Sequence, residues 1–267
     1  MRLHLDFETR CEADLKEVGL RRYVADPSFK IILTAWAIDD GPTVVYEGLE
    51  RDLFGPLLDR FDTLHAFNAP FELACLARYG VLVPLPKVRC TMAHAYGRGF
   101  SGGLADVGDQ VGIPEELRKI KEGSTLITKF CKPRRPSAKN PDRFWTKETA
   151  PTDWERFKEY NRNDVEAERA IWRVLNDEAP WAPEEQTTWE LDREVNDRGL
   201  PVDVTLAQTA VDTAAAEKQR IEARCKQITD GISPSQVGAL LAWCRERGYT
   251  ENDLGAETIQ SYLKSFA

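Results

Sequence analysis

Three short stretches of the sequence carry acidic side chains in arrangements that could hold a metal ion. In the first stretch, Asp6 and Glu8 alternate with apolar residues, a pattern typical of a β-strand. The two-residue period of a strand places both carboxylates on one face, about 7 Å apart. Such a pair can share a divalent cation. The same Asp-x-Glu pattern also occurs on the solvated face of an edge strand, so the pair alone does not establish a site.

The second stretch is a helix expected over residues 152–175. Five of its residues follow the i, i+3, i+4 spacing of a single face: Phe157, Tyr160, Asp164, Ala167 and Ile171. This spacing predicts that Asp164 points toward the core, where an unpaired carboxylate is costly. A cation shared with Asp6 and Glu8 would offset that cost, as would a buried arginine. Tyr160 lies one turn earlier on the same face, close enough to orient a water molecule at the cation.

The third stretch, residues 67–72, has the character of a junction between a strand and a helix. Asn68 can cap the helix, and Pro70 suits its first turn. Glu72 then falls in the first helical turn, where a carboxylate interacts favourably with the helix dipole. Glu72 is therefore either a fourth acidic residue of the site or an ordinary capping charge.

The elements that must position these residues follow an α/β pattern. Alternation and turn residues predict strands at residues 3–7, 30–38, 43–46 and 63–67, with an antiparallel start, and helices at residues 51–61, 68–80 and 152–175. Residues 152–155 have the form of a capping box, which is expected to begin the last of these helices.

An all-helical pattern follows the α/β part. Pro180 and Pro183 end the long helix, and three further helices are expected at residues 184–197, 205–229 and 233–247. We therefore expect a domain over residues 1–180 and a smaller helical segment over residues 181–267. A chain of 267 residues with 42% hydrophobic content can bury one large core or two smaller ones.

The net charge of −8 is distributed unevenly. Between Arg118 and Lys147 there are ten basic residues and two acidic ones. Phe130, Phe144 and Trp145 are interleaved with these charges, and such a segment suits a nucleic-acid strand that needs both phosphate contacts and stacking surfaces. An ordinary solvated loop would have the same composition.

The remaining composition excludes several other classes of protein. The sequence has no run of about 18 apolar residues and no leader pattern, so we expect a cytoplasmic protein without membrane contact. The six cysteines are scattered and are expected to be buried thiols rather than disulfides. His4, His65 and His94 have no partner at zinc spacing, so no zinc site is expected.

Taken in order, the three acidic stretches form a pattern that resembles the DEDD exonucleases. The pattern consists of Asp-x-Glu in a first strand, Asn-x-x-Phe-Glu at residues 68–72, and Tyr-x-x-x-Asp at residues 160–164. It is similar to the tyrosine variant, because Glu159 stands where the histidine variant has its histidine. Within that superfamily, nearly the whole chain resembles the proofreading domain of phage family A DNA polymerases, including residues 119–133 and 189–203.

This resemblance implies an RNase H-like mixed sheet flanked by helices and a two-metal hydrolysis of the terminal phosphodiester. Asp6, Glu8 and Asp164 match the ligands of the first ion, with Asp6 bridging to the second and Glu72 supporting the second. Tyr160 and Glu8 match residues that aim the attacking water. Two Mg²⁺ ions are expected from the all-oxygen shell, and Mn²⁺ should substitute.

The resemblance also implies a substrate. Thr9 and Asn68 match positions that contact the terminal nucleotide, and Phe71 is expected beside them. The expected partner is DNA with a single-stranded or frayed 3′ end, and replication proteins are further candidates. A ribonuclease of the same superfamily is an alternative, since no motif here reports on contacts to a 2′-hydroxyl.

Two departures from the family pattern qualify these expectations. The second motif commonly ends in aspartate, whereas here it ends in Glu72, which leaves a catalytically weak or inactive DNA-binding scaffold as an alternative. Residues 181–267 resemble the start of the polymerase region, up to part of the thumb. The chain ends before the palm and finger motifs, so no polymerisation is expected from it.

Overall fold

The computed structural model describes residues 1–49, 56, 60–117, 123–136 and 142–265. The chain forms two compact units, residues 1–198 and residues 199–267, which are described separately below. Within the described residues, no helix combines the length and apolar character needed to cross a membrane. All six cysteines are free, but only Cys11, Cys75 and Cys90 are buried as expected; Cys131, Cys225 and Cys244 are half-buried.

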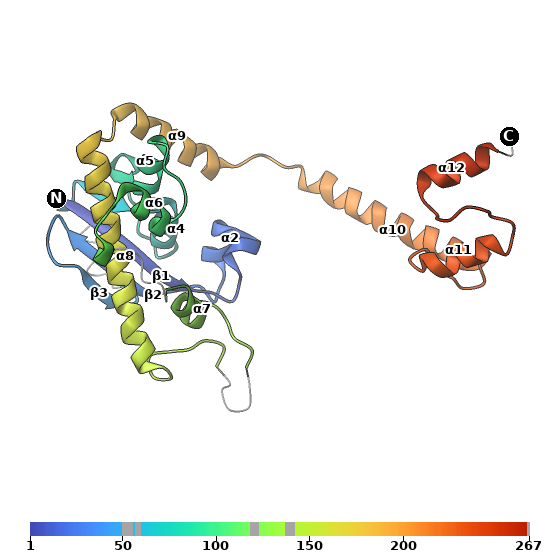
Figure 1. The fold of residues 1–267 in the computed structure, drawn as a ribbon, viewed down its shortest axis with the longest axis horizontal. Helices are drawn as coiled ribbons and strands as arrows, with labels where there is room; N and C mark the ends of the chain where they lie inside the picture. The colour runs from blue at the N-terminus through green and yellow to red at the C-terminus, as the bar shows by residue number, and fades with distance from the viewer. Residues whose placement is uncertain (50–55, 57–59, 118–122, 137–141, 266–267) are drawn as a thin grey trace. The chain divides into compact units, whose positions relative to one another are not determined.

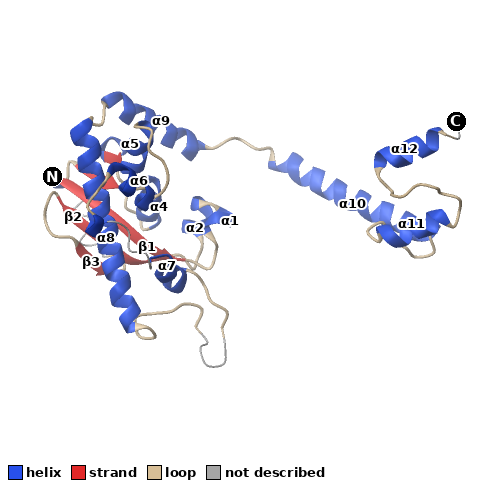
Figure 2. Cartoon of the chain, viewed as in Figure 1, coloured by secondary structure: helices blue, strands red, loops and turns tan. Residues whose placement is uncertain are grey.

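The first unit is built on a five-stranded mixed sheet in the order β3-β2-β1-β4-β5. The strands, red in Figure 2, are β1 (Arg2–Arg10), β2 (Lys30–Ile38), β3 (Val44–Glu47), β4 (Thr63–Ala66) and β5 (Val88–Cys90). The first three strands pair antiparallel, whereas β4 and β5 run parallel to β1. The predicted fold class, a mixed sheet with flanking helices followed by an all-helical segment, is confirmed.

Eight described helices accompany this sheet: α1 (Leu15–Val18), α2 (Leu20–Ala25), α4 (Ala69–Arg78), α5 (Thr91–Gly97), α6 (Leu104–Val111), α7 (Gly123–Cys131), α8 (Pro151–Glu178) and α9 (Pro183–Arg198). The long helix α8 lies across one face of the sheet and packs on β1, β2 and β3 (Figure 1). The helix expected at residues 51–61 falls largely outside the described residues.

The first strand occupies the centre of the sheet, so both of its faces are covered. Leu3, Leu5 and Phe7 point into a core that also contains Cys75 and Leu76 of α4. The alternate residues of β1 point the other way, toward α8. The acidic pair of β1 is therefore not on the solvated face of an edge strand.

The five apolar-face residues predicted for α8 are all buried, which confirms the helical period assigned to them. The expected capping box is wrong, however. The helix begins at Pro151, with Ala150 at the N-cap position and no side-chain capping hydrogen bond. Because proline readily occupies the first helical position, Thr152 lies inside the helix and cannot cap it.

The boundary between the units lies between Arg198 and Gly199, whereas the sequence suggested a division near residue 180. Helix α9 belongs to the first unit because Trp189 is buried in the same core as Leu3 and Leu5. The prolines at 180 and 183 thus separate two helices of one unit.

The second unit contains α10 (Val204–Ile228), α11 (Val237–Arg245) and α12 (Ala256–Lys264). Asp203 caps α10, because its side chain accepts a hydrogen bond from the backbone N–H of Leu206 at 2.8 Å. Helix α11 begins after Gln236, later than the expected start at residue 233.

Candidate metal centre and its surroundings

The structure brings together three of the acidic residues singled out in the sequence. One carboxylate oxygen each from Asp6, Glu8 and Asp164 lies within 4.8 Å of the other two. Asp6 and Glu8 come from β1, and Asp164 comes from the stripe of α8 that packs on the sheet. Glu8 and Asp164 are 8% and 7% exposed, and Asp6 is half-buried. Residues more than 150 positions apart therefore form one compact group of hard oxygen donors.

The pairing of β1 with β2 shifts register at this point. Glu8 pairs with Leu33 of β2 and Thr9 pairs with Ile31, so Ile32 of β2 is the extra residue of a β-bulge. A bulge bends the strand and re-aims the side chains that flank it, and bulges are frequent beside active sites. Asp6 and Glu8 keep the alternation expected from the sequence, since both carboxylates reach Asp164 of α8.

Asn161 is a member of the site that the sequence reasoning missed. Its Nδ2 donates a hydrogen bond to Oδ2 of Asp6 at 2.7 Å, and the residue is fully buried. Asn161 precedes Asp164 by three residues, so both project from the same side of α8. The sequence could have pointed to Asn161 through its position one turn before Asp164 on the core face of the helix, because a buried amide requires a hydrogen-bond partner.

Glu72 lies near the acidic group but outside the set of atoms within 4.8 Å. It is 3% exposed, in the first turn of α4, and its Oε2 has no hydrogen-bond partner among the described residues. Burial raises the pKa of the Glu72 carboxyl well above its ordinary value, and the negative charges of Asp6 and Glu168 raise it further. Proton uptake or a nearby cation would each relieve this buried charge.

Tyr160 is packed against the acidic group. Burial raises the pKa of its hydroxyl, the charges of Asp164 and Glu8 add to that effect, and the hydroxyl is hydrogen-bonded to the Asp164 carboxylate. The ring is held by α7, since a Cβ atom on Gly123 would lie 2.1 Å from Cε2 of Tyr160. The hydroxyl therefore stays protonated and is fixed beside the carboxylates.

The residues expected to bind substrate are distributed around this group. Thr9 and Phe71 line a cavity of about 420 Å³ together with Glu8, Tyr23 and Cys131. That volume lies within the range of small-ligand pockets, roughly 300–1,000 Å³. Asn68, by contrast, is exposed at the start of α4 and is not part of the cavity lining. A larger hollow of about 640 Å³ between α2, α4 and α9 is lined by none of the four acidic residues Asp6, Glu8, Glu72 and Asp164.

The basic segment of residues 118–147 is described only in part. Trp145 has Lys129 Nζ at 4.7 Å and Arg134 Cζ at 4.3 Å from its ring centroid, and Arg10 lies over Phe144. The expectation that Phe130 offers a stacking surface is wrong. Phe130 is fully buried against α8, because it lies on the core face of α7.

Comparison with known proteins gives one relative by sequence. The chain is 32% identical over 270 residues to the DNA polymerase of Bacillus phage SP02, an alignment that covers 98% of this chain and 41% of that protein. The chain thus spans less than half the length of this relative. No family model matches the chain.

Among solved structures, the family B DNA polymerase of the archaeon Pyrobaculum calidifontis is similar with a TM-score of 0.40 and 13% identity. The similarity covers 72% of this chain and 28% of that one. The assignment of the fold therefore rests on the order and directions of the strands.

Proposed function

We propose that the first unit is a divalent-metal-dependent 3′→5′ exonuclease that hydrolyses the terminal phosphodiester of DNA. The observation that carries this proposal is the convergence of Asp6, Glu8 and Asp164, whose ligand atoms lie within 4.8 Å of one another. The DNA polymerase of a phage as a sequence relative supports DNA as the substrate.

The residues present fit hard divalent cations. Carboxylate oxygens are the ligands that Mg²⁺ and Mn²⁺ favour, and three such groups in a buried site repel one another until a cation joins them. Asp6, Glu8 and Asp164 would hold one ion. Glu72, with its orphaned buried oxygen beside Asp6, would support a second. Bound ions would supply activation of a water molecule and stabilisation of the leaving 3′ oxygen.

The other residues orient the reactants. The Tyr160 hydroxyl stays protonated and donates to the Asp164 carboxylate, so its oxygen can accept a hydrogen bond that aligns the attacking water. Glu8 lies both in the acidic group and in the lining of the cavity shared with Thr9 and Phe71. A terminal nucleoside in that cavity would therefore place its phosphate beside the carboxylates, with Phe71 available to stack on the base.

The decisive experiment compares Asp6→Asn and Asp164→Asn with the unchanged protein. We expect each substitution to reduce Mg²⁺-dependent release of mononucleotides from a 3′-labelled single-stranded oligodeoxynucleotide by at least about a hundredfold. Asp177→Asn, an exposed aspartate on the same helix, is the matched control and should leave release unchanged.

Undiminished release by either site variant would refute the assignment. If the unchanged protein binds DNA with a steep salt dependence but releases nothing in Mg²⁺ or Mn²⁺, the alternative of an inactive DNA-binding scaffold is supported instead. Faster release from an oligoribonucleotide of the same sequence would indicate a ribonuclease.

A further inference from the structure

A second group of buried polar side chains lies next to the acidic group, on the same strand β1 and the same helix α8. His4 precedes Asp6 by two residues on β1, and Glu168 follows Asp164 by four residues on α8. Nδ1 of His4 donates a hydrogen bond to Oε2 of Glu168 at 2.6 Å. Both residues are 3% exposed.

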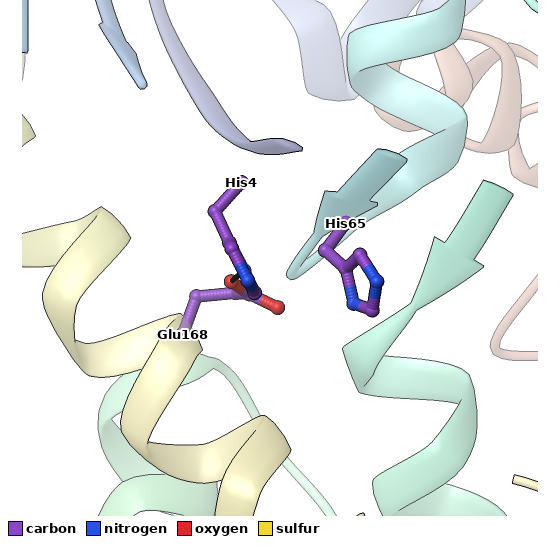
Figure 3. A group of neighbouring side chains, drawn as sticks. All are labelled: His4, His65 and Glu168. Carbon is purple, nitrogen blue, oxygen red and sulfur yellow. Dashed lines mark hydrogen bonds and ion pairs between the residues drawn. The ribbon is translucent and has the colours of Figure 1, made fainter. Parts of the chain in front are cut away.

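The carboxylate of Glu168 connects three elements. Its second oxygen, Oε1, accepts a hydrogen bond from the hydroxyl of Thr91, the first residue of α5. On the other side of His4 lies His65, its register partner on β4, with 4.7 Å between the ring centroids. Figure 3 shows Glu168 reaching from α8 to the His4 ring, with His65 beyond it.

These residue types could also form a zinc site, and one ligand atom from each of His4, His65 and Glu168 lies within 4.8 Å of the others. The hydrogen bonds oppose that interpretation. Both oxygens of Glu168 already accept hydrogen bonds, from His4 and Thr91, although Nδ1 of His65 is buried without a partner among the described residues. The His4–Glu168 distance is that of a direct charge-assisted hydrogen bond, with no room for an ion between the two atoms.

The His4–Glu168 pair and the Asp6–Asp164 pair are successive contacts between β1 and α8. Two residues of a strand advance about 7 Å, and four residues of a helix advance about 6 Å. The step from His4 to Asp6 thus matches the step from Glu168 to Asp164. The hydrogen bond between His4 and Glu168 therefore sets the distance between the carboxylates of Asp6 and Asp164.

We propose that His4 and Glu168 are positioning residues that hold β1 and α8 at the separation at which Asp6 and Asp164 share a cation. This inference rests on the proposed function. It adds a role for a buried pair that the hydrolytic chemistry itself does not use.

The test measures cation binding without turnover. Hydrated Mn²⁺ gives a six-line electron paramagnetic resonance signal that is lost on binding, so a titration of the full chain yields the dissociation constant. We expect His4→Leu and Glu168→Gln each to raise this constant about tenfold, the usual scale for residues that orient metal ligands. The double variant should have about the same Mn²⁺ dissociation constant as either single variant, because the same His4–Glu168 contact is broken in all three.

A conservative substitution distinguishes positioning from general packing. In His4→Asn the amide can replace Nδ1 as the donor to Glu168, so most of the Mn²⁺ affinity should return. Gln186→Leu is the matched control, since Gln186 is also buried but bonds to Arg89 and Leu85. It should lower the melting temperature and leave Mn²⁺ binding unchanged.

If His4→Leu does not fold, Thr91→Val takes its place, because it removes one of the two hydrogen bonds to Glu168 and should give a smaller rise in the same constant. Folded His4 and Glu168 variants with unchanged Mn²⁺ affinity would overturn the inference. So would stoichiometric zinc in the purified protein that disappears in His4→Leu.

The outcomes also separate this inference from the proposed function. If the unchanged protein takes up no Mn²⁺, the proposed function fails. If it binds Mn²⁺, loses binding in Asp164→Asn and keeps it in the His4 and Glu168 variants, the function stands and only the positioning role is lost.

Discussion

The fully buried amide of Asn161 fixes one carboxylate of the acidic group, because it donates to Oδ2 of Asp6. We expect Asn161→Leu, which keeps the volume but removes the donor, to raise the Mg²⁺ concentration for half-maximal nucleotide release about tenfold. The measurement is the release rate as a function of Mg²⁺ concentration. Asn163→Ala is the control, since Asn163 lies on the same helix but bonds to the Leu117 carbonyl oxygen. Equal Mg²⁺ requirements in the two variants would contradict this role.

A second prediction at the residue scale concerns pH. Burial lowers the pKa of His65 well below its ordinary value, and the nearby His4 lowers it further. The unfolded chain takes up this proton near pH 6.5 while the folded chain does not, so stability is lost as the pH falls below about 6.5. We expect the free energy of unfolding to fall more steeply between pH 7 and 5 in the unchanged protein than in His65→Gln. The difference can reach about 1.4 kcal/mol per pH unit.

Urea unfolding at a series of pH values measures this difference. The other titrating groups are common to both proteins and cancel in the comparison. Parallel curves for the two proteins would show that His65 keeps an ordinary pKa in the folded state.

At the scale of elements, the contact between α7 and α8 depends on the absence of a side chain at residue 123. A methyl group there would lie 2.1 Å from the Tyr160 ring, far inside the distance at which carbon atoms attract. Gly123→Ala should therefore cost about 1–3 kcal/mol of stability and also slow nucleotide release, since the Tyr160 hydroxyl moves with its ring. Ser124→Ala, at the next and exposed position, should do neither. Urea midpoints and release rates of the two variants provide the check.

The elements also show which parts of the structure can be predicted from sequence. Periodicity predicted β1 and α8 because each has an apolar face that must be buried, and that face defines the period. The Asp6–Glu8 pair and Asp164 were predictable for the same reason. Strand β2 is buried on both faces and was predicted as an apolar run bounded by turn residues. Periodicity also predicts that a residue faces the core without identifying what it meets there.

The residues that the sequence did not reveal are those whose role depends on a distant partner. Asn161 and Glu168 lie on the same side of α8 as Asp164, yet their partners are on β1, more than 150 residues away. The burial of Phe130 was locally visible in its four-residue spacing from Leu126. The high positive charge around it favoured the wrong interpretation.

At the scale of the whole molecule, the proposed active-site residues all belong to the first unit. We therefore expect a fragment of residues 1–198 to fold and to release mononucleotides from single-stranded DNA at the rate of the full chain. Thermal unfolding and the release assay measure the two properties. A folded fragment that has lost activity would show that residues 199–267 contribute to catalysis.

The concentration of so many roles on α8 restricts how the length of this chain can vary. The hydroxyl of Tyr160, the amide of Asn161 and the carboxylates of Asp164 and Glu168 project from little more than two turns of one unbroken helix. Each inserted residue rotates everything that follows by about 100°. An insertion or deletion inside that span would turn part of the set away from β1, so length changes can be tolerated only toward the two ends of the helix.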